Sequence, residues 1–329
     1  MARMVGEHLL ERWRRLWRPR TIFPFLIVGA MIALSQVVNS SVAIFPEAAA
    51  LSLGTLVLQK ESWKSSRPRL VILPTIAAGL GVSIVALGVP TLVGVPILLI
   101  IIVLALHFLD SELFPTISAG VLPIVFLISD PWFLLTVFLV VGSIATISVL
   151  MDTVAAKKPH VHEAHRLFSL RPPPAGLVRF LIVAVPWIFL ARASLPLPAI
   201  APPLLVSIYE WYSRPERRPS NAAKRWIVMV VAGSLGEITT HIGLGAFGVV
   251  LAELVLLAFM AVLSSIDPPA MAVLLLPWIA EAISPTSFIF AIAVASLVLY
   301  GLGLEFSFWT DTALVGMFRG TSRRHPLVE

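Results

Sequence analysis

The chain has 329 residues, of which 58% are hydrophobic and only 13% are charged. Water-soluble domains carry roughly 25% charged residues, so this composition excludes an ordinary soluble domain and predicts that lipid surrounds most of the chain. The net charge of +6 lies in short basic clusters between apolar stretches, which favours topology signals facing lipid headgroups over a nucleic-acid-binding surface. The absence of cysteine excludes disulfides, catalytic thiolates and thiolate metal sites.

The first twenty residues contain arginines and two tryptophans, Trp13 and Trp17, but no apolar stretch precedes the arginines. This order is not that of a signal peptide. Alternating basic and aromatic residues are typical of a helix that lies in the membrane interface. Residues 1–20 are therefore predicted to form an amphipathic segment on the cytoplasmic side.

Apolar runs follow one another through the rest of the chain with short connections. Their lengths and composition predict about twelve transmembrane segments, with ten or eleven crossings as the alternative if some short runs re-enter the same face. The runs are 22–39, 44–58, 70–88, 91–109, 114–128, 132–151, 176–194, 200–212, 226–243, 245–265, 268–283 and 286–306.

The basic residues test the number of crossings, because Lys and Arg concentrate in cytoplasmic loops. With the N-terminus in the cytoplasm, twelve crossings place the basic loops 60–69, 155–175 and 213–225 and the C-terminal tail on the same side. All of the 24 Lys and Arg residues except Arg192 then lie in or beside cytoplasmic segments. We therefore expect a multi-pass protein of the cell membrane with both termini in the cytoplasm.

Four of the apolar runs are short, and each opens with proline, at Pro46, Pro115, Pro202 and Pro268. Proline is favoured at the first position of a helix, where its missing N–H removes no hydrogen bond. Each short helix is therefore predicted to begin at its proline. A helix of about 15 residues is only ~22 Å long, whereas the hydrocarbon core is ~30 Å thick. Each of these helices is expected to begin inside the membrane.

The order of a long helix, a short proline-started helix and a long helix occurs four times along the chain. With the orientation above, consecutive three-helix units run in opposite directions, which predicts an all-α fold of two parallel six-helix halves, each a 3+3 inverted repeat. The alternative is that a proline-started helix is only a short helix with a regular start. The predicted regions are 1–20 (N-terminal segment), 21–154 (first half), 155–174 (cytoplasmic linker), 175–306 (second half) and 307–329 (cytoplasmic tail).

Several short motifs carry a resemblance to a known family. The segment Asp267–Ala272 reads Asp-Pro-Pro-Ala-Met-Ala and resembles the His-Pro-Pro-Ala-Gly-Ala signature of the HPP family of membrane proteins. Phe114–Gly120 is similar to a degraded copy, and Asp130–Phe133 resembles the Asp-Pro-Trp-Phe stretch downstream of the signature. Phe114 and Asp267 stand where the signature has histidine.

Members of the HPP family are typically half as long, so residues 21–306 resemble two fused HPP-like units. Relatives in plastids have been linked to nitrite transport. The resemblance therefore implies that this chain transports a small ion.

Helix N-termini inside a membrane attract anions, because their N–H groups have no partner and carry about half a positive charge. The short helices therefore predict a binding site for a small anion near the membrane midplane. An ionised Glu47 would oppose an anion at its own helix, so this residue is alternatively a capping or protonatable group. The predicted site residues at these helix starts are Pro46, Glu47, Thr116, Ser118, Pro203, Asp267 and Pro269.

Ionisable residues within apolar helices cost roughly 2.5–3.5 kcal/mol each on insertion scales and usually face an interior or a cavity. Glu237 and His241 are four residues apart on one predicted helix, where they form either a proton relay or a structural hydrogen-bonded pair. Glu253 and Glu281 are further candidates for the same site. Arg192 is a candidate as well, with snorkelling to the outer headgroups as its alternative.

The loop His160–His165 contains three histidines and a glutamate, which would suit zinc or copper. Its order His-Glu-Ala-His is one residue shorter than the zinc-protease motif. The favoured interpretation is a solvated loop, and the alternative is a weak metal-regulatory site. No metal or other cofactor is predicted.

A transporter or channel for a small solute, with an inorganic anion such as nitrite as the favoured solute, is the favoured function, because internal repeats supply two related conformations for alternating access. The alternatives are an intramembrane lipid-modifying enzyme that uses Glu237 and His241 as acid and base, or a non-catalytic membrane subunit. The expected partners are the lipid bilayer and a small anionic or neutral solute, without nucleic acid. The protein is expected to be a monomer or homodimer and not an enzyme.

Overall fold

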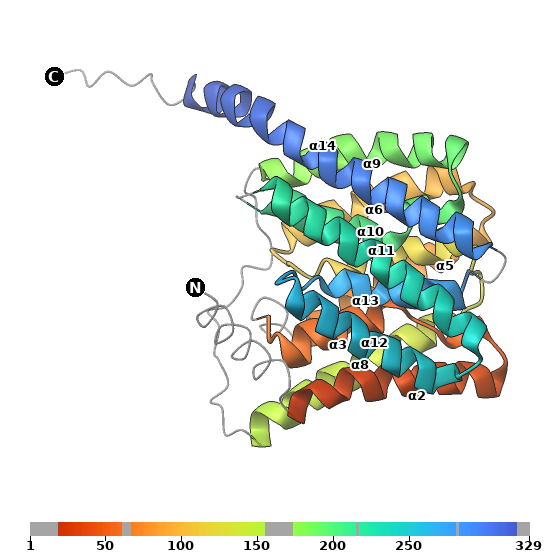
Figure 1. Cartoon of the computed structure of the whole chain (residues 1–329). Coiled ribbons are helices and arrows are strands. Elements are labelled where there is room, and N and C mark those ends of the chain that lie inside the picture. Colours follow the sequence, from red (N-terminus) through yellow and green to blue (C-terminus); the bar gives the residue numbers. More distant parts are fainter. Residues whose placement is uncertain (1–18, 61–66, 155–173, 215–216, 281–282, 321–329) are drawn as a thin grey trace, which may run out of the picture.

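The computed structural model of the chain describes residues 19–60, 67–154, 174–214, 217–280 and 283–320, and every regular element within them is helical (Figure 1). Eight of these helices are long. They are α2 (Ile22–Val38), α5 (Arg67–Ala86), α6 (Thr91–Phe108), α8 (Trp132–Val154), α9 (Ala175–Ser194), α11 (Pro219–Ile242), α12 (Gly245–Val262) and α14 (Pro285–Gly320).

Four helices are short, and brief 3₁₀ or π segments extend two of them. The short helices are α3 (Glu47–Ser52) with its π continuation η3 (Leu53–Val57), α7 (Pro115–Phe126), α10 (Pro202–Ser213), and α13 (Pro268–Leu275) with its 3₁₀ continuation η5 (Leu276–Trp278). Further 3₁₀ turns precede α2, α3 and α10; they are η1 (Pro19–Thr21), η2 (Ser41–Ala43) and η4 (Leu197–Ile200).

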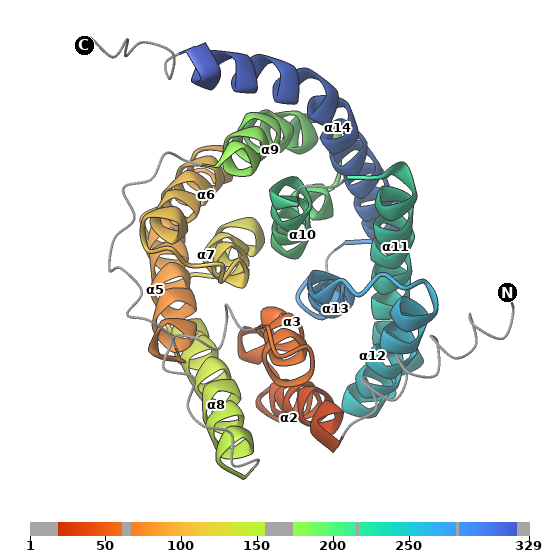
Figure 2. The ribbon, with the colours of Figure 1, turned by 90° about the vertical axis from the view of Figure 1, so that its left-hand side faces the viewer.

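The long helices form a ring, and the four short helices fill its centre (Figure 2). Around the ring the order is α2, α8, α5, α6, α9, α14, α11 and α12, after which α12 packs against α2. In the centre, α3 contacts α7 and α13, and α10 contacts α7 and α13. The ring therefore surrounds the central helices except between α2 and α8, which stand apart in Figure 2.

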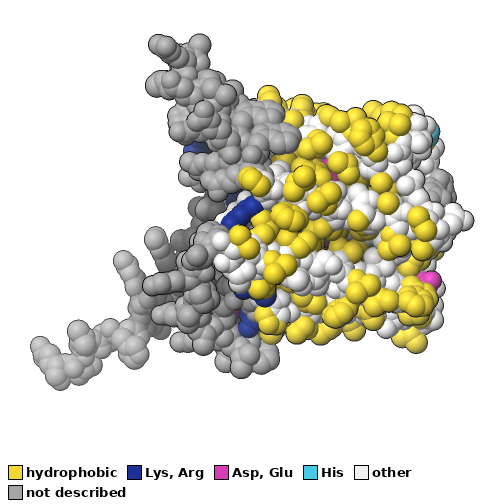
Figure 3. Space-filling view, turned by 90° about the horizontal axis from the view of Figure 1, so that it is seen from below, with side chains coloured by type: hydrophobic (Ala, Val, Ile, Leu, Met, Phe, Trp, Pro, Cys, Tyr) yellow, Lys and Arg dark blue, Asp and Glu magenta, His cyan; other side chains and the backbone are white. Residues whose placement is uncertain are grey.

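The outer surface of the ring is apolar over the view in Figure 3, with Lys and Arg gathered at one end. Large apolar side chains such as Val37 (84% exposed) and Phe247 (70% exposed) point outward. Among the described residues, seven helices are long and apolar enough to cross a membrane; α11, which carries the buried Arg225 and Glu237, is not one of them. A water-soluble protein would not expose so much apolar surface, and the chain has the features of a membrane-embedded helical protein.

The short helices are as short as the sequence predicts. At 1.5 Å per residue, the twelve residues of α7 span about 18 Å, well below the ~30 Å of a hydrocarbon core. The helices α7, α10 and α13 begin at Pro115, Pro202 and Pro268 as predicted. The prediction for the first short helix is wrong by one residue, because Pro46 occupies the N-cap position and α3 begins at Glu47.

Two long helices extend further than their apolar runs. Helix α11 begins at Pro219, so part of the segment 213–225 that was predicted as a basic loop is helical. Helix α14 continues to Gly320, beyond the predicted end of the last span at residue 306. Hydropathy marks where a helix enters lipid, and polar turns of the same helix can continue outside it.

The ring and the central helices approach most closely at glycines. A Cβ atom on Gly81 of α5 would lie 2.1 Å from the carbonyl oxygen of Gly120 on α7, and one on Gly236 of α11 would lie 2.3 Å from that of Leu274 on α13. Real Cβ atoms do not tolerate such distances, so both contacts require glycine. Helices α5 and α7 of the first predicted half are therefore joined by the same kind of contact as α11 and α13, the helices at the same positions in the second.

Some sequence-based expectations fall outside the described residues. These are the interfacial helix at 1–18, most of the linker 155–174 with the His160–His165 loop, the end of the tail from 321, and Glu281.

Candidate functional site

The central helices enter the ring from both ends. Arg69 near the start of α5 donates a 2.7 Å hydrogen bond to the carbonyl oxygen of Leu109, just after α6, which places these two helix ends together. Since α3 leads towards α5 and α7 follows α6, helices α3 and α7 run in opposite directions. The corresponding chain order in the second half gives α10 and α13 opposite directions as well. Polar groups at their N-terminal turns can thus meet inside the bundle.

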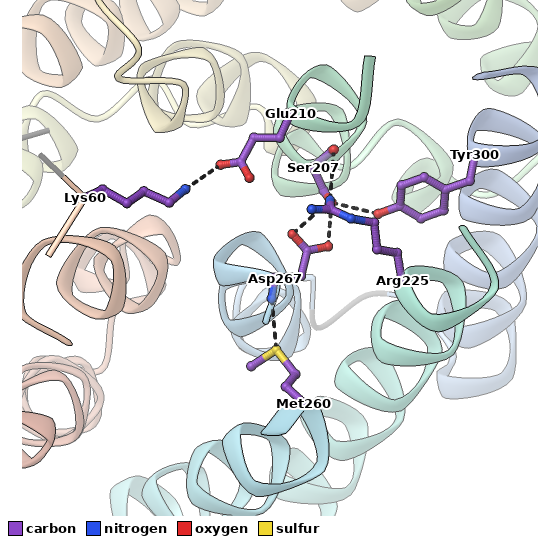
Figure 4. A network of polar contacts seen from close by, with 7 residues as sticks. All are labelled: Lys60, Ser207, Glu210, Arg225, Met260, Asp267 and Tyr300. Atoms are coloured by element: carbon purple, nitrogen blue, oxygen red, sulfur yellow. Dashed lines mark hydrogen bonds and ion pairs between the residues drawn. The ribbon is translucent and has the colours of Figure 1, made fainter. Parts of the chain in front are cut away.

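The largest polar group in the interior consists of Arg225, Asp267, Ser207 and Tyr300, here called the Arg225 cluster (Figure 4). Asp267 is the N-cap of α13. Its two carboxylate oxygens have different partners: Oδ1 lies 3.2 Å from Nη1 of Arg225, and Oδ2 accepts a 2.6 Å hydrogen bond from the Ser207 hydroxyl. The cluster therefore joins α10, α11, α13 and α14.

The remaining contacts of the Arg225 cluster complete a closed network. Nη1 of Arg225 also donates to the Ser207 hydroxyl at 3.1 Å, and the hydroxyls of Ser207 and Tyr300 are 2.7 Å apart. The guanidinium lies 5.9 Å from the ring centre of Trp211, close enough for a cation–π interaction. Arg225 is 2% exposed and Asp267 is 0% exposed, so the ion pair is buried.

In this cluster a guanidinium and a hydroxyl together hold the carboxylate of Asp267. A carboxylate is a planar, singly charged oxyanion, and here a guanidinium and a hydroxyl hold its two oxygens. Guanidinium groups match planar oxyanions such as carboxylate through directed N–H donors. The groups that hold Asp267 are thus suited to a small planar anion of the same charge.

A second polar group lies at the start of α3 and α7 and consists of Glu47 and Ser118, here called the Glu47 cluster. The Ser118 hydroxyl donates a hydrogen bond to Oε1 of Glu47. The other carboxylate oxygen, Oε2, has no hydrogen-bond partner among the described residues, and the same holds for the Thr116 hydroxyl. Glu47 is 1% exposed and Thr116 is 4% exposed. The structure therefore brings Glu47 and Ser118, two residues that the sequence predicts for the site, into contact.

A third contact links the two halves of the chain near the basic end. Lys60, which follows α3 and its continuation, forms a 3.0 Å ion pair with Glu210 of α10 (Figure 4). Glu210 is buried, whereas Lys60 is partly exposed. This pair ties the C-terminal ends of two central helices to each other.

The other predicted site residues are distributed over the molecule. Pro46, Pro203 and Pro269 are buried at the starts of central helices, where they shape the backbone. Glu253 of α12 is 0% exposed, and neither of its carboxylate oxygens has a hydrogen-bond partner among the described residues. Arg192 is exposed in the last turn of α9, as expected for a snorkelling side chain.

Glu237 and His241 lie in the last turns of α11, about 18 Å along the helix axis from Arg225. Glu237 is buried, but His241 is exposed. Nδ1 of His241 lies 2.8 Å from the backbone carbonyl oxygen of Glu237. The pair is thus close in space, but it is remote from the Arg225 cluster along the helix.

Sequence reasoning identified Asp267 but missed its partners. Arg225 was counted as part of a basic loop, because the apolar run begins one residue later. Pro219 was the available signal, since proline favours the first turn of a helix and a start there places Arg225 inside α11. Ser207 and Tyr300 carried no signal, because isolated hydroxyls in apolar helices are common.

Comparisons of this chain with protein-family models, with curated proteins and with solved structures gave no match. The interpretation of the site therefore depends on its geometry.

Proposed function

We propose that the chain is a membrane transporter for a small inorganic anion, with its binding site among the N-terminal turns of the central helices. The observation that carries this proposal is the Arg225 cluster, in which a buried guanidinium and a hydroxyl hold a planar oxyanion next to the start of α13. Buried ionisable groups are costly within a membrane and usually mark the path of a solute or ion.

The architecture proposed for this function is a pair of parallel six-helix halves, each an inverted 3+3 repeat, with twelve membrane segments. The ring order supports it, because α2, α8, α5 and α6 are followed by α9, α14, α11 and α12, their counterparts in the same order. The matching contacts of Gly81 and Gly236 also support it. Repeats of this kind allow one unit to rock against another around a central site.

The proposed orientation puts the basic end of the ring, and with it both termini, in the cytoplasm. Lys60 follows the continuation of α3, and Arg67 and Arg69 stand in the first turn of α5, which meets the end of α6. Lys and Arg concentrate in cytoplasmic segments of multi-pass proteins.

The proposed substrate class is a planar, singly charged oxyanion such as nitrite. Such an anion matches the size, charge and oxygen spacing of the Asp267 carboxylate and would compete with it for Arg225. The resemblance of Asp267–Ala272 to the HPP signature favours the same class. Because Asp267 would have to release Arg225, the site alternates between an internal and an external anion.

The proposal is tested by measuring anion uptake into vesicles that contain the purified chain. We expect exchange of ¹⁵N-labelled nitrite against internal nitrite, and a loss of at least about tenfold in Arg225→Gln, because the amide carries no charge. Arg192→Gln is the matched control, since this arginine is exposed at the far end of α9. The absence of any exchange above protein-free vesicles for nitrite, nitrate and formate would contradict the proposal.

A further inference from the structure

The Glu47 cluster differs from the Arg225 cluster in its charge. Both contain an acidic side chain beside a serine hydroxyl at the start of a central helix. Asp267 is paired with a buried guanidinium, whereas Glu47 accepts a hydrogen bond from Ser118 and has one carboxylate oxygen without a partner among the described residues. A buried carboxylate without a compensating cation is unfavourable unless it holds a proton.

We infer that Glu47 is the proton-coupling residue of the transporter, binding one proton at Oε2 for each anion carried. This inference rests on the proposed function and assigns the coupling ion to the first half of the chain, while the anion site lies in the second half.

The other buried carboxylate without a partner among the described residues, Glu253, lies on α12 in the ring and not on a central helix. The helices packed against α3 include α2, α7 and α13, which contain no ionisable residue within their bounds. Helix α8 also packs against α3, and its one ionisable residue, Asp152, is paired with Arg67 at 2.7 Å in the last turns of α8. Asp267 at the start of α13 is paired with Arg225. Glu47 is therefore the acidic group of the central helices that lacks a cationic partner among the described residues.

The charge balance suits this assignment. When Oε2 accepts a proton from the water on one side, an O–H bond forms and the carboxylate becomes neutral. One proton together with one singly charged anion carries no net charge across the membrane. Release of the proton to water on the other side restores the carboxylate, so that each cycle moves one proton and one anion.

The Ser118 hydroxyl is the polar neighbour that the structure shows for the proton on Glu47. Ser118 lies in the first turn of α7 and is buried. A hydroxyl can donate to a carboxylate and can accept from a carboxylic acid. The Glu47 cluster can therefore satisfy both protonation states of the carboxyl group by rotation of this hydroxyl.

The test separates exchange from net transport in vesicles that contain the full chain. Exchange of labelled for unlabelled nitrite needs no net proton movement, whereas accumulation driven by an inward proton gradient does. For Glu47→Gln we expect the ratio of proton-driven accumulation to exchange to fall at least about tenfold below that of the unchanged protein. Asp152→Asn is the matched carboxylate-to-amide control and should retain both activities.

A second variant keeps the inference testable if Glu47→Gln fails to fold. Glu47→Asp retains the carboxyl group but withdraws it from Ser118, so accumulation should persist with a shifted pH midpoint. Normal accumulation by Glu47→Gln, or loss of exchange together with accumulation in a folded Glu47→Gln, would overturn the inference while leaving anion transport intact. Absence of exchange in the unchanged protein would instead overturn the proposed function.

Discussion

At the scale of single residues, the buried ion pair of Arg225 and Asp267 is the most consequential feature of the chain. Removing two charges from water costs several kcal/mol each, and their attraction repays this only where further hydrogen bonds satisfy them. Ser207 and Tyr300 supply such bonds. Stability alone does not require the pair, since well-packed apolar residues often replace a buried ion pair without loss. A functional reason for retaining it is therefore favoured.

Substitutions at this pair give a stability prediction that is independent of transport. Arg225→Met leaves the Asp267 carboxylate buried and unpaired, so we expect a loss of about 3–5 kcal/mol in the free energy of unfolding. The double variant Arg225→Met with Asp267→Leu should recover most of that loss. The measurement is reversible unfolding of the purified protein in detergent.

The matched control is the ion pair of Arg67 and Asp152, whose side chains are 36% and 18% exposed. Arg67→Met should cost only about 0–1 kcal/mol, because water and lipid headgroups screen this pair. Equal losses in the free energy of unfolding for Arg225→Met and Arg67→Met would show that burial does not make one ion pair more important for stability than the other.

At the scale of helices, glycines decide how closely the ring approaches the central helices. Gly81 and Gly236 allow α5 and α11 to touch the backbone of α7 and α13, with Pro123 and Pro277 beside the same contacts. A short helix in the centre of a ring has no other way to come so near a long one, since any side chain on the facing surface would hold the backbones apart. These contacts fix the position of the inner helices, and with them the two polar clusters.

Alanine at these glycines should therefore destabilise the fold. Gly81→Ala and Gly236→Ala each force a methyl group against a backbone carbonyl, and overpacking of this kind costs about 1–3 kcal/mol. Gly142→Ala in α8 is the control, because its Cβ would meet nothing within 4 Å. At Gly142 the better helix propensity of alanine predicts an increase of about 1 kcal/mol or less in the free energy of unfolding. Thermal unfolding in detergent compares the three variants, and a stable Gly81→Ala protein would refute the close contact.

At the scale of the whole molecule, the two halves contact each other in the ring and in the centre. Helices α2 and α12 close the ring on one side and α6 and α9 on the other, while α3 packs against α13 and α7 against α10. The ion pair of Lys60 and Glu210 adds a polar link between the halves. The linker between α8 and α9 is not needed to hold these surfaces together.

A chain divided in the linker should therefore assemble from two pieces. We expect residues 1–160 and 161–329, expressed together in a membrane, to co-purify and to bind nitrite as the intact chain does. Each piece expressed alone should aggregate or be degraded, because half of the central contacts would be missing. Failure of the pieces to co-purify, with each accumulating alone, would contradict an extensive interface between the halves.

Much of the helical framework could be predicted from local signals. The apolar runs mark most of the helices, and Pro115, Pro202 and Pro268 mark the starts of three short ones. The end of α14 could not be predicted, because residues 307–320 mix apolar and polar side chains and give no clear hydropathy boundary. For the site, the acidic residues Glu47 and Asp267 were identified because charges in apolar runs are conspicuous, but their partners were not.

By itself the sequence determined that this protein is a bundle of apolar helices with four short helices, each starting at or directly after a proline, because composition and proline act on the chain locally. Only the tertiary structure decided that the short helices lie inside a ring, and that Arg225 meets Asp267 while Glu47 meets Ser118. Ser207 and Tyr300 are 93 residues apart in the chain. No periodicity of hydropathy encodes such a pairing, because it depends on which faces of distant helices come together when the bundle closes.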